Sequence, residues 1–418
     1  MKQLRFHAKE DPARGRVNSV DPVFLILVML LLTLGLLMLW SASFPQSEFD
    51  SNYTESTRYL RKQLFCAILG LGAMAAFSRI EPVRWHRFTW HIYAAAIVLL
   101  LAVLVVGQSV NGAKRWVSIA GIQFQPSEIA KFAVILAFAR LSRAYGPRAA
   151  EFRYGVLGFS AALLGILVPL ALEKHLSAIL LIGMVAVVMM FLSGTRMKYL
   201  LMGAALAGLF VLVYITFMGY AGDRVTAWLD PQSDPSDTGY QILQSLYAIG
   251  SGGVFGLGFG RGRQKYLYLP FQYNDYIFAI VCEELGLLGA AGIMALFAAL
   301  ILRGYHLARS AADRFSAMLC AGLTTLLAVQ TVLNLCVVTN MLPSTGIALP
   351  FFSYGGTALA VTLGEMGIIL AVSRQREEPK LQEVTHLSTQ EFFPQHMQLI
   401  FHQRNVHLLR IFVLLQTQ

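Results

Sequence analysis

The residues that could do chemistry gather in one polar segment, residues 219–275. The segment combines aspartates with arginines and lysines: Asp223, Arg224, Asp230, Asp234, Arg261, Arg263, Lys265 and Asp275. Carboxylates beside guanidinium and ammonium groups suit the phosphate of a lipid headgroup, with a divalent cation between phosphate and carboxylate. The alternative is a solvated loop with turn prolines, which most single charges here would fit equally well.

A glycine-rich run in this segment resembles a nucleotide-binding motif only superficially. Gly256, Gly258 and Gly260 alternate with apolar residues. A dinucleotide fingerprint lies in a βαβ unit, and no such pattern surrounds this run. We therefore exclude a dinucleotide site.

The elements that position this segment are apolar. Hydrophobic residues make up 56% of the chain and charged residues only 13%, which is wrong for a soluble surface. The apolar residues form ten blocks: 23–40, 64–77, 88–106, 129–141, 154–172, 176–192, 199–218, 276–302, 315–338 and 357–372. Crossing a bilayer takes roughly 20 residues and several blocks are shorter, so the second and fourth must borrow flanking polar residues or tilt.

We predict an all-α, polytopic membrane protein of about ten transmembrane helices. Residues 219–275 form a long outer loop between the seventh and eighth helices. Residues 1–21 are a cytoplasmic N-terminal segment, 22–376 the membrane domain and 377–418 a cytoplasmic tail without an assigned role. The four cysteines lie in apolar blocks without metal spacing, so neither disulfides nor zinc are expected.

Orientation follows from the positive charges. With the N-terminus inside, 22 of the 33 Lys and Arg residues fall in cytoplasmic segments, ten fall outside and Lys131 falls within a span. The net charge of +10 is therefore mainly a topology signal, and no nucleic-acid partner is indicated. We expect a multi-pass protein of the cytoplasmic (inner) membrane with both termini cytoplasmic.

Five charged residues are expected inside the membrane and need partners: Glu128, Lys131, Glu283, Glu284 and Glu365. Glu128 and Lys131 are one helical turn apart, which allows either an intrahelical pair or interhelical links. Glu283 and Glu284 point about 100° apart, so both cannot meet one partner.

Six runs in order carry a specific resemblance. They are NGAKRW (111–116), QFQPSEIAKF (123–132), DRVTAWLDP (223–231), GYQILQSLYAIGSGGVFGLGFG (239–260), YNDYIFAIVCEELG (273–286) and MLPSTGIALPFFSYGG (341–356). Together they resemble the shape, elongation, division and sporulation (SEDS) family over residues 22–376. The last run is closer to the FtsW and SpoVE branch than to RodA.

The resemblance implies a peptidoglycan glycosyltransferase. Such an enzyme polymerises lipid II, an undecaprenyl-diphosphate-linked disaccharide-pentapeptide, into glycan strands on the outer face of the membrane, in cell division or sporulation. The reaction needs a base for the acceptor hydroxyl, cations for the leaving diphosphate and a groove for two lipid tails. A lipid II flippase and a noncatalytic scaffold of the division machinery are the alternatives.

In this resemblance Asp275 matches the catalytic aspartate. It would take the hydroxyl proton, and together with the diphosphate it would hold a divalent cation, Mg²⁺ or Mn²⁺. The alternative is that Asp275 only caps the N-terminus of the eighth helix.

The other expected site residues are cations, polar groups and an aromatic residue. Those implied to bind substrate are Lys114, Arg115, Trp116, Arg224, Gln264, Lys265 and Ser353, and those implied to support the site are Glu128, Lys131, Glu283 and Glu284. Arg115 and Arg224 are the strongest candidates, because a planar guanidinium suits diphosphate oxygens.

The resemblance also implies protein partners. The outer loops contain no Ser-x-x-Lys motif, so a class B penicillin-binding protein is expected to supply transpeptidase activity, alongside other division or sporulation proteins.

One segment departs from the family pattern. Where many relatives read Gln-Pro-Asp-Leu-Gly-Thr between the fifth and sixth spans, residues 173–178 read Glu-Lys-His-Leu-Ser-Ala. Whether Glu173 or His175 replaces the missing aspartate stays open.

Overall fold

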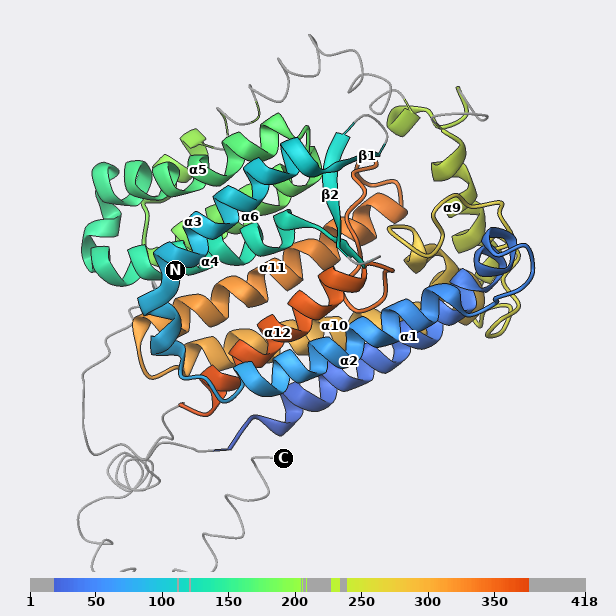
Figure 1. Cartoon of the computed structure of the whole chain (residues 1–418), viewed down its shortest axis with the longest axis horizontal. Coiled ribbons are helices and arrows are strands. Elements are labelled where there is room, and N and C mark those ends of the chain that lie inside the picture. The colour runs from blue at the N-terminus through green and yellow to red at the C-terminus, as the bar shows by residue number, and fades with distance from the viewer. Residues whose placement is uncertain are drawn as a thin grey trace, which may run out of the picture. The chain divides into compact units, whose positions relative to one another are not determined.

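The structure is a computed structural model of the chain, and it describes residues 19–110, 113–119, 122–203, 205, 208, 227–233 and 239–375. The all-α polytopic fold is confirmed (Figure 1). The long helices are α1 (Pro22–Asp50), α2 (Arg58–Phe77), α3 (Pro82–Val106), α4 (Pro126–Tyr145), α5 (Phe159–Leu172), α6 (Leu176–Ser193), α9 (Tyr240–Gly252), α10 (Ile277–Arg309), α11 (Arg314–Val338) and α12 (Gly356–Ser373).

Eight of the described helical segments are long and apolar enough to span a membrane. α4, which falls on the fourth predicted block, is not among them because it carries Glu128, Lys131, Arg140 and Arg143, yet its 20 residues are mostly buried against other helices. The seventh block, 199–218, lies largely outside the described residues. The number ten therefore stays a prediction.

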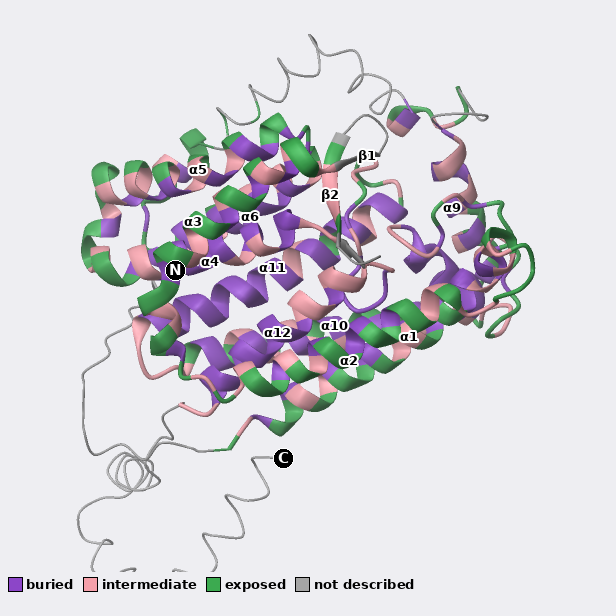
Figure 2. Cartoon of the chain, viewed as in Figure 1, coloured by how far each residue is buried: buried purple, intermediate pink, exposed green. Residues whose placement is uncertain are grey.

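Packing places α11 and α12 inside the bundle. In their most apolar stretches, 72% of the α11 residues and 67% of the α12 residues are buried, against 22% for α3. α11 contacts α4, α6 and α10, and α12 contacts α2. Figure 2 shows both α11 and α12 as mostly buried. The outer helices leave apolar side chains exposed, as expected for surfaces that face lipid.

Local sequence explains where the helices begin and end. The Asp21 carboxylate accepts a hydrogen bond from the Phe24 amide at 2.8 Å, and Asp313 caps α11 in the same way through Phe315 and Ser316. Proline is the first residue of α1, α3 and α4, where its missing N–H costs nothing. α6 ends at Gly194 in the left-handed conformation.

Two elements were not predicted. A small antiparallel sheet in the order β1-β2-β3 joins α3 to α4, with strands β1 (Gln108–Val110), β2 (Ala113–Ile119) and β3 (Ile122–Phe124). The long loop also contains the amphipathic helix α9. Both lie outside the apolar blocks, so hydropathy alone could not find them.

The glycine-rich run supplies hydrogen-bond partners to the backbone at a break in α10. Gly286 has φ 67° and ψ −170°, and a Cβ there would lie 2.2 Å from the Gly256 amide nitrogen. The amides of Leu257 and Gly258 donate to the carbonyls of Glu283 and Glu284 at 3.0 Å, while Leu287 and Leu288 donate to the carbonyls of residues 253 and 254. The loop thus satisfies backbone groups that the break releases, as a helix in lipid requires.

The described membrane domain belongs to one compact unit, which comprises residues 1–9 and 18–376. A second unit comprises residues 10–17 and 377–418, which lie outside the described residues.

Candidate active site

Asp275 lies one residue before the end of the turns that lead into α10. Its side chain is half-buried, and its backbone carbonyl accepts a hydrogen bond from Asn334 Nδ2 of α11 at 2.7 Å. The N-cap position of α10 is Tyr276, whose side chain makes no capping hydrogen bond. The alternative that Asp275 only caps this helix stays open. We call the end of the bundle that holds this residue the Asp275 end.

The connection between α11 and α12, residues 339–355, lies against Asp275. Asn334 Nδ2 also donates to the Ile347 carbonyl at 2.7 Å, and Gly346 approaches the Asp275 carboxylate so closely that a Cβ there would lie 3.5 Å from Oδ2. Gly346 has φ 63°, a conformation that favours glycine. Asn334 therefore fixes Asp275 and this connection together.

Ser353, an expected substrate-binding residue, stabilises this connection instead. Its side chain is buried, its Oγ accepts a hydrogen bond from the Leu349 amide at 2.7 Å, and its carbonyl accepts one from Gln63 Nε2 at 3.1 Å. The structure thus gives Ser353 an internal role and does not present it for contact with a substrate.

The β2 strand carries Lys114, Arg115 and Trp116. Arg115 is half-buried and donates through Nη2 to the carbonyl of Lys174, which lies between α5 and α6. Lys114 is exposed, and its Nζ donates to the Leu104 carbonyl at 3.2 Å. The pairing of β1 with β2 is irregular here, because Trp116 pairs with Gln108 and Lys114 with Ser109, which leaves Arg115 as the extra residue of a bulge.

The Arg115 partner belongs to a tight turn formed by residues 173–175, which we call the Glu173 turn. The His175 amide donates to the Leu170 carbonyl and the Lys174 amide to the Ala171 carbonyl, both at 3.0 Å. This is the Schellman pattern at a helix C-terminus, with Lys174 in the left-handed position at φ 55°. The turn directs the side chains on either side of Lys174 inward.

Glu173 and His175 are buried, with 2% and 7% of their surfaces exposed. Glu173 Oε2 lies 4.0 Å from His175 Nδ1. Burial raises the pKa of Glu173 to about 8, although the nearby Arg115 opposes this, and burial with Arg115 and Lys131 lowers the pKa of His175 to about 3. At neutral pH this pair is uncharged.

Glu128 and Lys131 form the intrahelical pair, with Oε2 and Nζ 2.7 Å apart in the first turns of α4. Both side chains are nearly buried, and the charge of Lys131 also acts on His175 and on Glu365 of α12. The pair therefore balances charge beneath the Glu173 turn, as a supporting role requires.

Lys265 lies inside an ion pair instead of facing outward. It is 3% exposed, and its Nζ donates at 2.8 Å to Glu284 Oε1, Ser41 Oγ and the Gly260 carbonyl. Glu284 also accepts from the amides of Gly260 and Gly262. Because all three Lys265 donors are used, its expected contact with substrate has no geometric support.

Glu283 binds a different part of the same loop. Its carboxylate accepts hydrogen bonds from the amides of Arg263 and Gln264, at 2.7 Å and 3.2 Å. The prediction that Glu283 and Glu284 do not share one partner is confirmed. Gln264, another expected substrate-binding residue, is held through its backbone.

A tyrosine cluster near Asp275 was not predicted. The rings of Tyr59, Tyr273 and Tyr354 lie 4.6–5.9 Å apart between centroids, and the Tyr354 amide donates to the Tyr273 carbonyl at 2.8 Å. Tyr59 also hydrogen-bonds Asp50 at the end of α1. Two of these tyrosines fall in the recognised runs, which was the available signal.

Arg224, the other strong candidate, lies outside the described residues. Within the part of the chain that the structure describes, no group of three or more His, Cys, Asp and Glu side chains could hold a metal. Asp275 could still contribute one carboxylate, and Mg²⁺ is commonly bound by one or two carboxylates together with substrate phosphates. The residues present fit that mode of binding.

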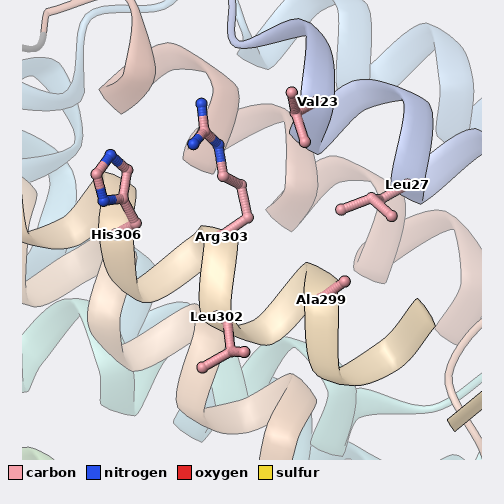
Figure 3. Close-up of a pocket in the computed structure, with 6 residues that line it drawn as sticks. All are labelled: Val23, Leu27, Ala299, Leu302, Arg303 and His306. Carbon is pink, nitrogen blue, oxygen red and sulfur yellow. The ribbon is translucent and has the colours of Figure 1, made fainter. Parts of the chain in front are cut away.

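A hollow of about 350 Å³ lies at the opposite end of the bundle, between α1 and α10. Its lining is Val23, Leu27, Ala299, Leu302, Arg303 and His306 (Figure 3). Arg303 pairs there with Asp21 at the start of α1. The hollow contains none of the expected site residues.

Comparison with known proteins adds three findings. The model of the cell cycle protein family FTSW_RODA_SPOVE matches residues 22–378. The chain is 37% identical over 359 residues to "Probable peptidoglycan glycosyltransferase FtsW" of Geobacter sulfurreducens, covering 85% of this chain and 96% of that protein. It is 35% identical over 362 residues to "Stage V sporulation protein E" of Bacillus subtilis, covering 85% and 98%.

Solved structures are also similar to this chain. A chain of a peptidoglycan synthase complex, studied for the coordination of polymerization and crosslinking, matches with a TM-score of 0.71 at 28% identity, covering 86% of this chain and 99% of that chain. The rod shape determining protein RodA of Thermus thermophilus matches with a TM-score of 0.64 at 27% identity, covering 86% and 98%.

Proposed function

Because the chain belongs to the FtsW, RodA and SpoVE family of cell cycle proteins, we propose that it is a peptidoglycan glycosyltransferase that polymerises lipid II. The observation that carries the proposal is the arrangement at the Asp275 end. A half-buried carboxylate, whose backbone is held by Asn334, lies at the same end as Arg115 and the Glu173 turn.

In the proposed reaction the 4-hydroxyl of an acceptor sugar attacks the anomeric carbon of a lipid-linked donor. A glycosidic C–O bond forms, and the bond from the anomeric carbon to the diphosphate oxygen breaks. Asp275 takes the hydroxyl proton, and the polyprenyl diphosphate departs with the bonding electrons. Arg115 stabilises the negative charge on the leaving diphosphate.

Asp275 would hold a divalent cation, Mg²⁺ or Mn²⁺, which would supply positive charge to offset the charge on the leaving group. Asn334 holds the Asp275 backbone in place for either role. Arg224 remains a second proposed contact to the diphosphate.

The proposal includes orientation and partners. The Asp275 end faces outward and both termini are cytoplasmic, in accord with the distribution of Lys and Arg. The protein acts in division or sporulation with a class B penicillin-binding protein as its transpeptidase partner. The matched chain of a peptidoglycan synthase complex supports such a partner.

The test is polymerisation of fluorescent lipid II by purified protein, as wild type and as Asp275→Asn. Asparagine keeps the shape of the side chain but neither takes a proton nor binds a cation well, so polymer should be lost while thermal unfolding in detergent is unchanged. Polymer formation by Asp275→Asn near the wild-type rate would contradict the assignment.

The same preparation separates the alternatives. A flippase would move lipid II across proteoliposome membranes without forming polymer, and a scaffold would do neither. Polymer from the wild type that depends on Asp275 excludes both as the sole function.

A further inference from the structure

The Glu173 turn holds a buried acid that the proposed mechanism does not use. Glu173 Oε1 and His175 Nδ1 have no hydrogen-bond partner among the described residues, although both side chains are more than nine-tenths buried. His175 Nε2 lies 3.4 Å from the Gln125 side chain. Unsatisfied buried polar groups are costly, so a reason for keeping these two is required.

The charged groups around this pair come from β2 and α4. The positive charge of Arg115 on β2 acts on both Glu173 and His175, and the positive charge of Lys131 on α4 acts on His175. Lys131 in turn forms an ion pair with Glu128 on α4 and interacts electrostatically with Glu365 on α12. Lys174, on the turn itself, is exposed. Among the described residues, the charged group outside the turn that acts electrostatically on Glu173 is therefore the Arg115 guanidinium.

The turn is also tied to Asp275. Ser177, in the first turn of α6, donates through Oγ to the Thr345 carbonyl, and the next residue, Gly346, lies against the Asp275 carboxylate. Arg115 is tied to the other side of the turn through the Lys174 carbonyl. Two hydrogen bonds thus connect the proposed base and the proposed diphosphate ligand through the Glu173 turn and the first turn of α6.

We propose that Glu173 and His175 are positioning residues for Arg115: as an uncharged pair they leave the guanidinium available to the diphosphate, whereas an ionised Glu173 captures it. The inference rests on the proposed function, because it assigns Arg115 to the diphosphate. It also explains why an acid without a second partner persists at this place. A neutral carboxyl beside Arg115 preserves the positive charge that the diphosphate needs.

The expected consequence is a dependence of substrate binding on pH. As pH rises through the Glu173 pKa of about 8, the carboxylate forms and competes with lipid II for Arg115. At pH 9 about one-tenth of the molecules would keep Arg115 available, so the KM for lipid II should rise about tenfold while kcat changes less. Glu173→Gln cannot ionise, and its KM should be the same at pH 7 and pH 9.

A second variant keeps the test independent of how Glu173→Gln folds. Arg115→Gln should have a raised KM at both pH values and no further rise at pH 9, and adding Glu173→Gln to it should change nothing. Glu55→Gln, which removes an exposed carboxylate at the Asp275 end, is the matched control and should keep the wild-type rise.

Each outcome decides a different statement. If Glu173→Gln keeps the rise in KM at pH 9, or if the rise persists in Arg115→Gln, the positioning role is overturned although polymer still forms. A wild-type KM that is equal at pH 7 and pH 9 overturns it as well. If the wild type forms no polymer at any pH, the proposed function itself fails and the positioning role falls with it.

Discussion

The proposed role of Arg115 depends on the planar geometry of its guanidinium group. Replacing it by lysine keeps the charge but loses the planar fork that matches two diphosphate oxygens. Losing one charge-assisted contact of roughly 1.5–3 kcal/mol should slow lipid II polymerisation about tenfold to a hundredfold if the contact acts in the transition state. The measurement is kcat/KM for Arg115→Lys.

Arg309→Lys is the matched control for this substitution. Arg309 is exposed in the last turn of α10, where only positive charge is needed, so its activity should match the wild type. Arg314 is less suitable, because its guanidinium donates to the Ser193 carbonyl at 2.9 Å and contacts Ser142. Equal activity of Arg115→Lys and Arg309→Lys would show that Arg115 is a surface charge.

His175 makes a separate prediction about stability. The pKa of His175 in the folded protein is about 3, below the ordinary value of 6.5. Below pH 6.5 the imidazole therefore binds a proton in the unfolded chain that it does not bind in the folded protein. His175 by itself should therefore lower the free energy of unfolding as pH drops from 6.5 toward 3, by about 2 kcal/mol at pH 5. The raised pKa of Glu173 has the opposite effect in both proteins, so the loss is measured by thermal unfolding in detergent as the change with pH in the difference between the wild type and His175→Asn.

The exposed His91 provides the comparison for that experiment. His91→Asn should keep the wild-type dependence of stability on pH, because His91 lies on α3 and outside the Glu173 turn. The same loss in His175→Asn as in the wild type would show that His175 does not carry the effect.

At the level of elements, the Glu173 turn places Lys174 in a backbone conformation that lysine disfavours. Lys174 occupies the left-handed position that glycine usually fills at a helix C-terminus, and its side chain is exposed. Lys174→Gly should therefore raise the free energy of unfolding by about 1 kcal/mol, whereas Lys174→Ala should give no gain. Thermal unfolding in detergent measures both, and a gain in the alanine variant would mean that the lysine side chain causes the strain.

Sequence reasoning found the apolar helices because a bilayer demands long uncharged runs, and nine of the ten predicted blocks fall on described helices. It also placed Glu128 beside Lys131, since their spacing is local. It could not show that Lys265 is buried against Glu284 and Ser41, because Ser41 lies 224 residues away in the chain. A lysine in a polar loop looks the same whether it faces a substrate or a buried carboxylate.

For the whole molecule, the proposed partnership makes the last prediction. A polymerase without its own transpeptidase should form more glycan when a cognate class B penicillin-binding protein is reconstituted with it in the same membrane. The rate of lipid II polymerisation with and without the partner measures this, and a partner whose transpeptidase serine is replaced should stimulate equally. Full activity of the chain alone, unchanged by any cognate partner, would contradict the expectation.

The glycine-rich loop also bears on how the protein is made. Glu283 and Glu284 are costly to insert into lipid. The amides that donate hydrogen bonds to their carboxylates belong to residues 260–264, only 19 to 24 positions earlier in the chain. During synthesis these donors leave the ribosome before the two acids do, so α10 can enter the membrane with its carboxylates already solvated by the preceding loop. A lesion at Gly260 or Gly262 would thus act first on biogenesis, as poor membrane insertion, and only afterwards on catalysis.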